Sequence, residues 1–236
     1  MRFLDLTLPT VAENLALDEA LLLEAEAGGE VLRVWEWPEP AVILGAGCRL
    51  AEDVDEAACV ADGVPILRRS SGGGTVLLGA GCLCYSFVLA YDRSPLLQEV
   101  RPSYRYILGR ICEMLNEVLP EIQRAGISDL AIGGRKVSGN AQQRKRHFLL
   151  HHGTLLYSLD LDLVGRYLHL PARRPEYRSS RSHAAFLMNL TINAKGLKDR
   201  LRSAWQADGA SLRWPEELVH QLALDKYSKA EWIRRR

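Results

Sequence analysis

Residues 68–74 combine charged donors with consecutive glycines in a way that favours binding of a phosphate or carboxylate group. Three successive glycines leave the backbone N–H groups open to a ligand and permit positive φ angles. Arg68 and Arg69 directly before them offer guanidinium donors that match a pair of anionic oxygens. A glycine triplet is also common in plain turns, so this segment alone leaves both interpretations open.

A lysine stands near the start of a second segment rich in small residues, 134–141. Gly133-Gly134 predicts a tight hairpin turn, after which Lys136 can project into a cleft. Its ammonium could hold a carboxylate or acyl-phosphate oxygen and stabilise the charge that develops during acyl transfer. The alternative is an ordinary solvent-exposed hairpin lysine.

Two adjacent histidines, His151 and His152, fall in a predicted strand. Side chains alternate along a strand, so the two rings face opposite sides and are poorly placed to bind one metal ion. One of them is expected to be structural and the other to line a pocket; a hydrogen-bonded core histidine is the alternative for each. Cys82 and Cys84 lie two apart in another strand without a second pair at ligand spacing, and we predict no metal site.

The common nucleotide-binding loops are missing from the sequence. Gly45-Ala46-Gly47 begins like a dinucleotide fingerprint, but the third glycine would fall at Leu50. No glycine–lysine pair is followed by Ser or Thr, which excludes a Walker loop. A nucleotide would therefore be bound through the glycine triplet.

The whole-chain composition excludes several classes of protein. A net charge of +1 over 236 residues argues against nucleic-acid or anionic-membrane partners. No run approaches the ~20 apolar residues that span a bilayer, and the N-terminus lacks the order of a signal peptide. The odd number of cysteines, 5, is typical of free thiols in a reducing compartment. We therefore predict a cytoplasmic protein.

Strands and helices must bring these segments together. A capping-box pattern at residues 10–13 predicts a helix that ends at the glycine pair 28–29. The residues 171–185, rich in Arg, Ser and Pro, predict an exposed loop. Strands in hairpins mixed with helices indicate an α+β fold with a mixed, mostly antiparallel β-sheet flanked by helices. Further strands are expected over 31–35, 41–44, 64–67, a pair up to 90, 129–132, 136 onwards and 151–157, and helices over 51–61, 104–119, 161–168 and near the end.

Taken together and in this order, the three segments resemble the lipoate–protein ligase and octanoyltransferase family of the biotin and lipoate ligase superfamily. Residues 68–74 are similar to its arginine–arginine–x–serine–triple-glycine element. Residues 135–141 are similar to its catalytic-lysine element, and 151–156 to its histidine–histidine–glycine–threonine–leucine–leucine strand. Residues 14–19, 226–227 and 231–232 are similar as well. The resemblance implies a single catalytic domain over 1–236 without a C-terminal accessory domain, which another protein could supply.

The resemblance implies a two-step reaction. Lipoate or octanoate and ATP, with Mg²⁺, form an acyl-adenylate, which a lysine of a carrier domain then attacks. The implied carriers are 2-oxoacid dehydrogenase acyltransferase subunits and the glycine-cleavage H protein. Lys136 is implied as the catalytic residue that contacts the acyl carbonyl and the phosphate. The implied substrate- and adenylate-binding residues are Arg68, Arg69, Ser71, Gly72, Gly73, Gly74, Thr75, Ser138, Gly139, Ala141, His152, Gly153 and Thr154.

Two alternatives stay open beside the ligase. An octanoyltransferase of the same fold would take octanoate from acyl carrier protein without ATP, through a cysteine nucleophile. No cysteine follows Cys112, and residues 125–130 resemble the ligases' glycine-x-x-aspartate segment, which favours the ligase; Cys48 is the one cysteine near a glycine-rich turn. A non-catalytic relative that binds a lipoyl group or carrier is supported by Leu78 and Gly79, which replace the ligases' usual histidine–aspartate pair, and is opposed by Lys136.

Overall fold

The computed structural model describes residues 1–172, 174–210 and 213–236. The strands are β1 (Arg2–Asp5), β2 (Val31–Glu36), β3 (Ala41–Leu44), β4 (Ile66–Arg68), β5 (Val76–Leu78), β6 (Cys82–Ala90), β7 (Gln123–Ala125), β8 (Asp129–Ile132), β9 (Arg135–Arg144), β10 (Phe148–Leu156) and β11 (Gly209–Ala210). The α-helices are α1 (Val11–Leu23), α2 (Ala25–Gly28), α3 (Leu50–Asp53), α4 (Glu56–Asp62), α5 (Val100–Asn116), α6 (Leu161–Tyr167), α7 (His183–Phe186), α8 (Ala194–Ala204), α9 (Glu216–Leu222) and α10 (Ala230–Ile233). Single 3₁₀ or π turns lie at Tyr91–Arg93, Pro95–Gln98, Glu176–Arg178 and Ala223–Tyr227.

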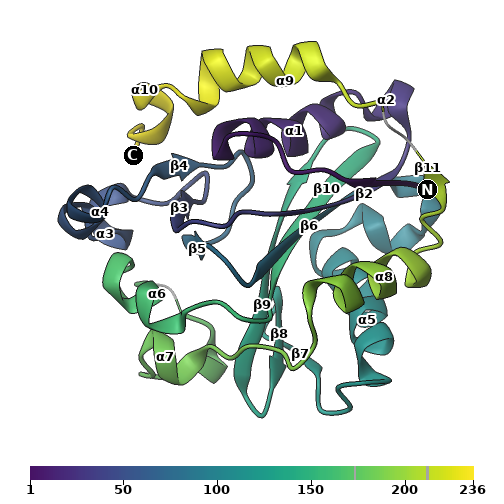
Figure 1. Ribbon diagram of the computed structural model, residues 1–236. Coiled ribbons are helices and arrows are strands. Elements are labelled where there is room, and N and C mark those ends of the chain that lie inside the picture. The colour runs from purple at the N-terminus through teal and green to yellow at the C-terminus, as the bar shows by residue number, and fades with distance from the viewer. Residues whose placement is uncertain (173, 211–212) are drawn as a thin grey trace.

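An eight-stranded sheet runs through the middle of the molecule in the order β11-β1-β2-β6-β10-β9-β8-β7 (Figure 1). β1 is parallel to both of its neighbours, whereas every pairing from β2 to β7 is antiparallel. A smaller sheet, β4-β3-β5, stands beside it and contains one parallel and one antiparallel pairing. The prediction of an α+β fold with a mixed, mostly antiparallel sheet is therefore confirmed.

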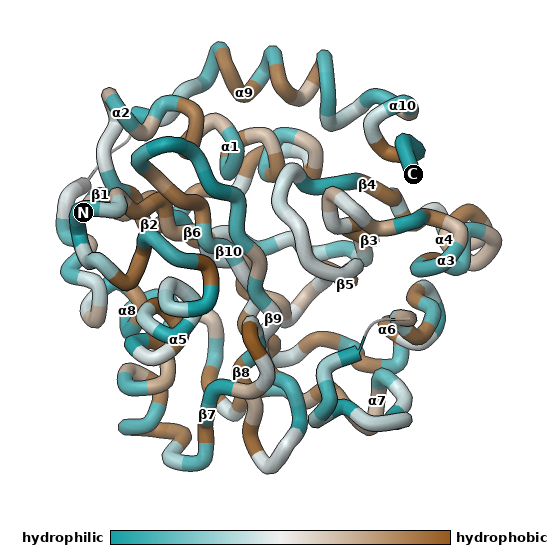
Figure 2. The backbone as a smooth tube through the Cα atoms, turned by 180° about the vertical axis from the view of Figure 1, so that it is seen from behind, coloured by the Kyte–Doolittle hydropathy of each residue, from teal (hydrophilic) through white to brown (hydrophobic). Residues whose placement is uncertain are grey.

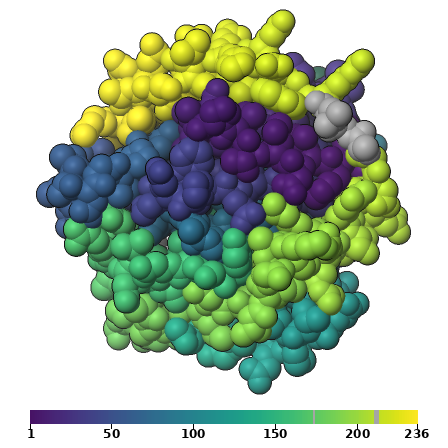
Figure 3. All heavy atoms as spheres, in the orientation of Figure 1, coloured from purple at the N-terminus to yellow at the C-terminus, as the bar shows by residue number. Residues whose placement is uncertain are grey.

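Each face of the large sheet packs against its own hydrophobic core, because side chains alternate along the strands. In β6, Cys82, Cys84 and Val88 join the core beneath α1 and the small sheet, while Leu83 and Phe87 join the core beneath α5 and α8. Figure 2 shows brown, hydrophobic segments recurring along β2 and β6 between these layers. The C-terminal helices lie against the N-terminal residues, as the yellow and purple atoms of Figure 3 show.

Helix α1 confirms the predicted N-terminal helix and its capping box. The Thr10 hydroxyl accepts from the Glu13 backbone N–H at 3.1 Å, and the Glu13 carboxylate accepts from the Thr10 N–H at 2.9 Å. The helical segment ends where Gly29 adopts a φ of 68°. The hairpin prediction is also confirmed, since Gly133 and Gly134 have φ angles of 54° and 72° between β8 and β9.

Residues 171–185 are largely exposed, as predicted, but they do not form a plain loop and one of their side chains is buried; Arg173 among them lies outside the described residues. The segment contains the Glu176–Arg178 turn and the start of α7, and Arg178 is buried. The guanidinium groups of Arg178 and Arg181 lie 4.7 and 5.2 Å from the ring centroid of Phe186. The polar composition concealed this packing because arginine side chains can cover an apolar ring while their charged ends donate to backbone carbonyls.

Candidate active site

A cavity of about 150 Å³ lies over the face of the large sheet that carries α1. Its floor is a row of one residue from each of five neighbouring strands, Trp35, Cys84, Thr154, Gly139 and Asp129, which stand opposite one another. Residues two places further along the strands share that face. The predicted site residues that line the cavity are Arg69, Gly73, Gly74, Thr75, Lys136, Gly139, Ala141, His152, Gly153 and Thr154.

A β-bulge turns Lys136 toward this cavity. Leu130 of β8 pairs with Ser138, but the next residue, Ala131, pairs with Lys136, so Val137 is an extra residue in β9. Strict alternation from Gly139 would place Lys136 on the far face of the sheet. The bulge instead sends Val137 into the core beneath α5 and brings Lys136 onto the cavity side.

The Lys136 ammonium is held in place by neighbours on both sides. Its Nζ lies 2.9 Å from Oδ1 of Asp129, whose other oxygen accepts from the Tyr177 hydroxyl at 2.8 Å. The ammonium lies directly over Gly139, where a Cβ would approach Nζ to 2.6 Å. A side chain at 139 would therefore push the ammonium away from this position. With glycine there, the cation is preorganised beside the cavity where charge would develop in acyl transfer.

The glycine-rich loop is folded around the guanidinium of Arg69. This buried group donates to the Ser71 hydroxyl at 3.0 Å and to the carbonyls of Gly72 and Gly74 at 2.6 and 2.8 Å. Gly73 between them has a φ of 83°, a conformation that side chains with a Cβ rarely adopt. Arg69 thus shapes the loop that forms one wall of the cavity.

Arg68 does not line the cavity, contrary to the prediction that it borders the ligand. It is fully buried and donates to the carbonyls of Gly45, Cys48 and Ile233 at 2.7–2.9 Å. The Trp232 indole N–H in turn donates to the Arg68 carbonyl at 2.7 Å. Arg68 therefore ties the wall of the site to α10. The structure also places Ser71, Gly72 and Ser138 outside the cavity lining.

A buried polar network lies beneath the glycine-rich loop and belongs to the site. The sequence patterns did not predict it. Asp18 of α1 pairs with Arg33 at 2.6 Å and lies 3.2 Å from Nδ1 of His152, whose Nε2 is 2.5 Å from the Ser71 hydroxyl. Burial raises the pKa of Asp18, but Arg33 and the bonds from His152 and Ser86 outweigh it and hold that pKa below its usual value. Only the resemblance at residues 14–19 pointed to Asp18.

The two histidines separate as predicted, with His152 at the cavity and His151 in the opposite core. The His151 ring lies near the rings of Tyr85 and Tyr104, and its Nδ1 is 3.1 Å from the Gln142 amide. Burial, with a smaller effect of His152, lowers the pKa of His151 to about 3. The neutral ring is therefore part of the folded core.

This buried histidine should make the free energy of unfolding depend on pH. Between pH 6.5 and about 3 the unfolded chain binds a proton at His151 and the folded chain does not, so stability falls as the pH is lowered through that window. This one histidine can lower the free energy of unfolding by at most about 1.4 kcal/mol for each pH unit within the window. Urea denaturation of His151→Gln between pH 7 and 4 should show a shallower slope than the wild type. His147→Gln, at an exposed position, is the control, and equal slopes for all three proteins would contradict the assignment.

Comparison with known proteins identifies the family. The model of the Lipoyl protein ligase A/B catalytic domain family matches residues 10–202. The chain belongs to this family. It is 30% identical to the octanoyltransferase LipM of Carboxydothermus hydrogenoformans over 98% of this chain and 97% of that protein. It is 31% identical to the "Probable lipoate-protein ligase A" of Mycoplasma pneumoniae over 66% of this chain and 45% of that protein.

Solved structures of lipoate–protein ligases share the fold. One is a bipartite lipoate protein ligase of Thermoplasma acidophilum, described with its E2 lipoyl domain; it superposes with a TM-score of 0.83 at 24% identity and covers 99% of this chain and 95% of that chain. Another is a lipoate-protein ligase A bound with ATP, with a TM-score of 0.81, 23% identity and coverage of 99% and 98%. The predicted family, fold and enzyme class are thus confirmed.

The cysteines near the cavity bear on the octanoyltransferase alternative, which would need a thiol nucleophile. Cys84 lies at the cavity, as part of its floor, and Cys48 donates from its Sγ to the Gly73 carbonyl at 3.4 Å. A hydrogen bond with Cys82, together with burial, raises the pKa of the Cys84 thiol well above its usual value. Burial raises the pKa of Cys48 as well. A raised pKa lowers the fraction of each thiol that is present as the nucleophilic thiolate at neutral pH.

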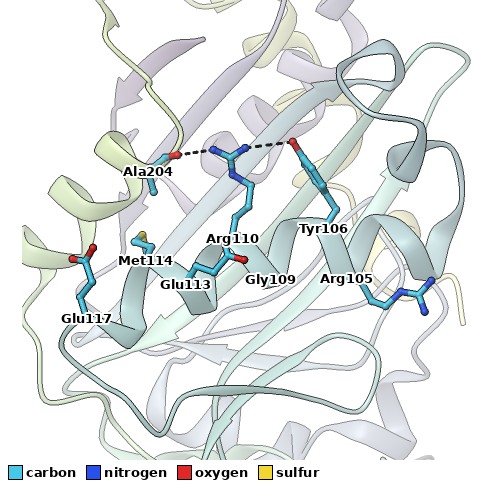
Figure 4. Close-up of a pocket in the computed structure, with 8 residues that line it drawn as sticks. All are labelled: Arg105, Tyr106, Gly109, Arg110, Glu113, Met114, Glu117 and Ala204. Carbon is cyan, nitrogen blue, oxygen red and sulfur yellow. Dashed lines mark hydrogen bonds between the residues drawn. The ribbon is translucent and has the colours of Figure 1, made fainter.

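A larger hollow of about 520 Å³ opens on the other side of the molecule, along α5 (Figure 4). Its charged lining residues are two arginines and two glutamates, and none of the predicted site residues lines it. Arg110 crosses it and donates to the Ala204 carbonyl at 2.8 Å and to the Tyr106 hydroxyl at 3.4 Å. Convergence of the lysine, the glycine loop and the buried acid identifies the smaller cavity as the candidate active site.

Within residues 1–172, 174–210 and 213–236, no three His, Cys, Asp or Glu side chains converge as they would around a metal ion. No helix in these ranges is both long and apolar enough to cross a membrane.

Proposed function

We propose that this enzyme joins lipoate or octanoate to a carrier-domain lysine through an acyl-adenylate. The observation that carries the proposal is the bulge that turns Lys136 onto the cavity that the glycine-rich loop also lines. A fixed cation facing a loop with open backbone donors suits an acyl group beside a phosphate. The proposed binding residues are those predicted ones that line the cavity, and the whole chain is proposed to act as one catalytic domain.

The chemistry proceeds in two displacements. A carboxylate oxygen of the acid attacks the α-phosphorus of ATP, a P–O bond forms, and pyrophosphate leaves. The neutral amine of the carrier lysine then attacks the acyl carbon, AMP leaves with the electron pair of the C–O bond, and the nitrogen loses a proton. Lys136 stabilises the negative charge on the carbonyl and phosphate oxygens in both steps, while Asp129 and Tyr177 keep it in position.

Mg²⁺ is proposed to enter as part of the ATP complex. A magnesium ion bound to a nucleotide takes most of its ligands from phosphate oxygens and water and only one or two carboxylates from the protein. Asp18 and Asp129 line the cavity and Asp53 is bonded to the lining residue Thr75. Because Asp18 and Asp129 already pair with Arg33 and Lys136, a magnesium ion would take most of its ligands from the nucleotide and water. The solved relative bound with ATP supports the nucleotide.

The proposed partners are lipoyl carrier domains. The solved bipartite ligase that was described with an E2 lipoyl domain supports this class, and we extend it to 2-oxoacid dehydrogenase acyltransferase subunits and the H protein. The same relative supports a separate accessory-domain protein as a further partner. We propose the cytoplasm as the location, where ATP is available and the free thiols remain reduced.

An octanoyltransferase is the second candidate, because the LipM relatives match along nearly their whole length. A cysteine of the enzyme would attack the octanoyl thioester of acyl carrier protein. The octanoyl group would then be bound to this cysteine as a new thioester, and the phosphopantetheine thiol of the acyl carrier protein would be released. Cys48 and Cys84 are the thiols near the cavity. Their raised pKa values favour the ligase.

A cysteine-free variant distinguishes the two candidates. With all five cysteines changed to Ala or Ser, we expect ATP-dependent transfer of lipoate to an apo carrier domain to persist, read by intact mass with and without ATP-Mg²⁺. If that variant fails to fold, Cys48→Ser and Cys84→Ser are tested singly. An octanoyl-thioester on either cysteine, formed from octanoyl acyl carrier protein without ATP, would overturn the ligase proposal.

A further inference from the structure

The side chain of Asn140 on β9 stands behind the cavity floor. Gly139 belongs to the floor, and because side chains alternate along a strand, the next residue points to the opposite face of the sheet. There the Asn140 amide nitrogen donates to the Ser128 carbonyl at 2.8 Å, and the amide oxygen accepts from the Tyr85 hydroxyl. Asn140 is absent from the site residues predicted from the sequence, although it lies between two of them.

The partners of this amide fix its orientation. The Ser128 carbonyl can only accept, so the amide nitrogen must face it, and the amide oxygen is left for the Tyr85 hydroxyl. Burial raises the pKa of that hydroxyl, which therefore keeps its proton and donates. The second N–H of the amide donates to the Ser138 hydroxyl at 3.1 Å. The Asn140 side chain is thus held in one orientation by three bonds.

The bond to Ser128 extends the contact between β8 and β9 beyond the end of β8. The backbone pairing of the two strands begins at Asp129 and Gly139. The Asn140 side chain reaches past that pair to the carbonyl of the residue before Asp129. The Asp129 carboxylate in turn lies 2.9 Å from Nζ of Lys136. Asn140 therefore fixes the piece of backbone that carries the counter-ion of the lysine.

Gly153 of β10 leaves the space that this side chain needs. It stands opposite Asn140 in the sheet, and a Cβ on Gly153 would lie 1.9 Å from the Asn140 amide oxygen. A side chain there would have to push the amide away from Ser128. The glycine of the 151–156 element is thus connected to the lysine of the 135–141 element through Asn140.

We infer that Asn140 is a positioning residue that holds Asp129, and through it the Lys136 ammonium, beside the cavity. The inference rests on the proposed role of Lys136 in acyl transfer and adds a support on the far face of the sheet. Asn140 also borders the cavity, so direct contact with the substrate is the alternative. A residue that acts through Lys136 contributes nothing once that lysine is removed, whereas a substrate contact contributes with or without it.

A double-mutant cycle separates the two roles. The single-turnover rate of carrier modification is measured for the wild type, Asn140→Ala, Lys136→Ala and the double variant. Asn140→Ala alone should lower the rate about tenfold or more, because displacement of a catalytic group by about 1 Å can cost about a hundredfold. In the Lys136→Ala background the same change should lower the rate by less than about twofold.

Two further variants complete the cycle. Tyr85→Phe removes only the hydroxyl that holds the amide, and should show a smaller loss with the same dependence on Lys136. This variant carries the test if Asn140→Ala does not fold. Asn116→Ala, at an exposed position at the end of α5, is the matched control and should transfer at the wild-type rate.

Chemical labelling tests the position of Lys136 without catalysis. The labelling of Lys136 by a small amine-reactive reagent is read by mass spectrometry relative to that of the exposed Lys145. The ion pair with Asp129 shields the Lys136 amine, so its loss in Asn140→Ala should raise the labelling several-fold, and Asn116→Ala should leave it unchanged.

Unchanged labelling of Lys136 in Asn140→Ala would overturn the inference, and so would an equal loss of transfer from this change in both backgrounds. The proposed function fails in a different way. If the wild type shows no ATP-dependent transfer but Asn140→Ala raises the labelling of Lys136, the proposed ligase is contradicted and the positioning role of Asn140 stands.

Discussion

Lys136→Ala should lower the rate of acyl transfer to the carrier roughly a hundred- to thousandfold, or about 2.7–4 kcal/mol in transition-state stabilisation. The loss is large because the ammonium is already fixed by Asp129 beside the cavity, so that little reorganisation is needed when charge develops. Alanine would leave the acyl oxygen without that cation. The measurement is the single-turnover rate of carrier modification with ATP and lipoate.

Lys145→Ala controls for loss of a positive charge on the same hairpin, since Lys145 is exposed near its tip. This variant should transfer at the wild-type rate. Thermal denaturation should show Lys136→Ala folded with a melting temperature near that of the wild type. If Lys136→Ala retained near-wild-type transfer, Lys136 would not be the catalytic residue.

Gly73→Val should weaken binding of a non-hydrolysable acyl-adenylate analogue by about a hundredfold or more, as expected when a site element is displaced by about an ångström. A β-branched residue resists the φ of 83° found here. Even a Cβ at this position would lie 2.9 Å from the Arg69 guanidinium and 3.4 Å from the Ala141 Cβ. Since Arg69 holds the loop through three bonds, the loop would have to move.

Gly47→Ala serves as the control, because a Cβ at Gly47 meets nothing within 4 Å and the residue is exposed in the adjacent loop. In calorimetric titration with the adenylate analogue, Gly47→Ala should bind with the wild-type affinity. Circular dichroism should show both variants folded. Unchanged affinity in Gly73→Val would mean that the glycine triplet is only a turn.

Local patterns predicted the elements of the fold well, because they depend on neighbouring residues. The capping box at Thr10 and the glycine pair before β9 each specify their own geometry, and the structure confirms both. The packing of residues 171–185 depends instead on arginine side chains that stack on Phe186, and composition alone concealed it.

The candidate site was predictable in its segments but not in its individual contacts. Arg68 and Arg69 are chemically identical neighbours, yet one faces the glycine loop and the other binds the carbonyl of Ile233, 165 residues away. One partner of Asp18, His152, is likewise distant in sequence, since it lies on β10, 134 residues further along the chain. Such long-range pairings follow from the topology of the sheet, which local sequence does not specify.

The bulge in β9 makes the number of residues between Lys136 and Gly139 part of the site. At the present spacing of three, regular pairing without the bulge would rotate the lysine to the far face of the sheet. Loss of one of the two intervening residues would remove the bulge and leave the lysine two places from Gly139, on the cavity face. An in-frame codon deletion here could therefore keep the cation beside the cavity on a regular strand, and the spacing between these two residues indicates whether the strand is bulged.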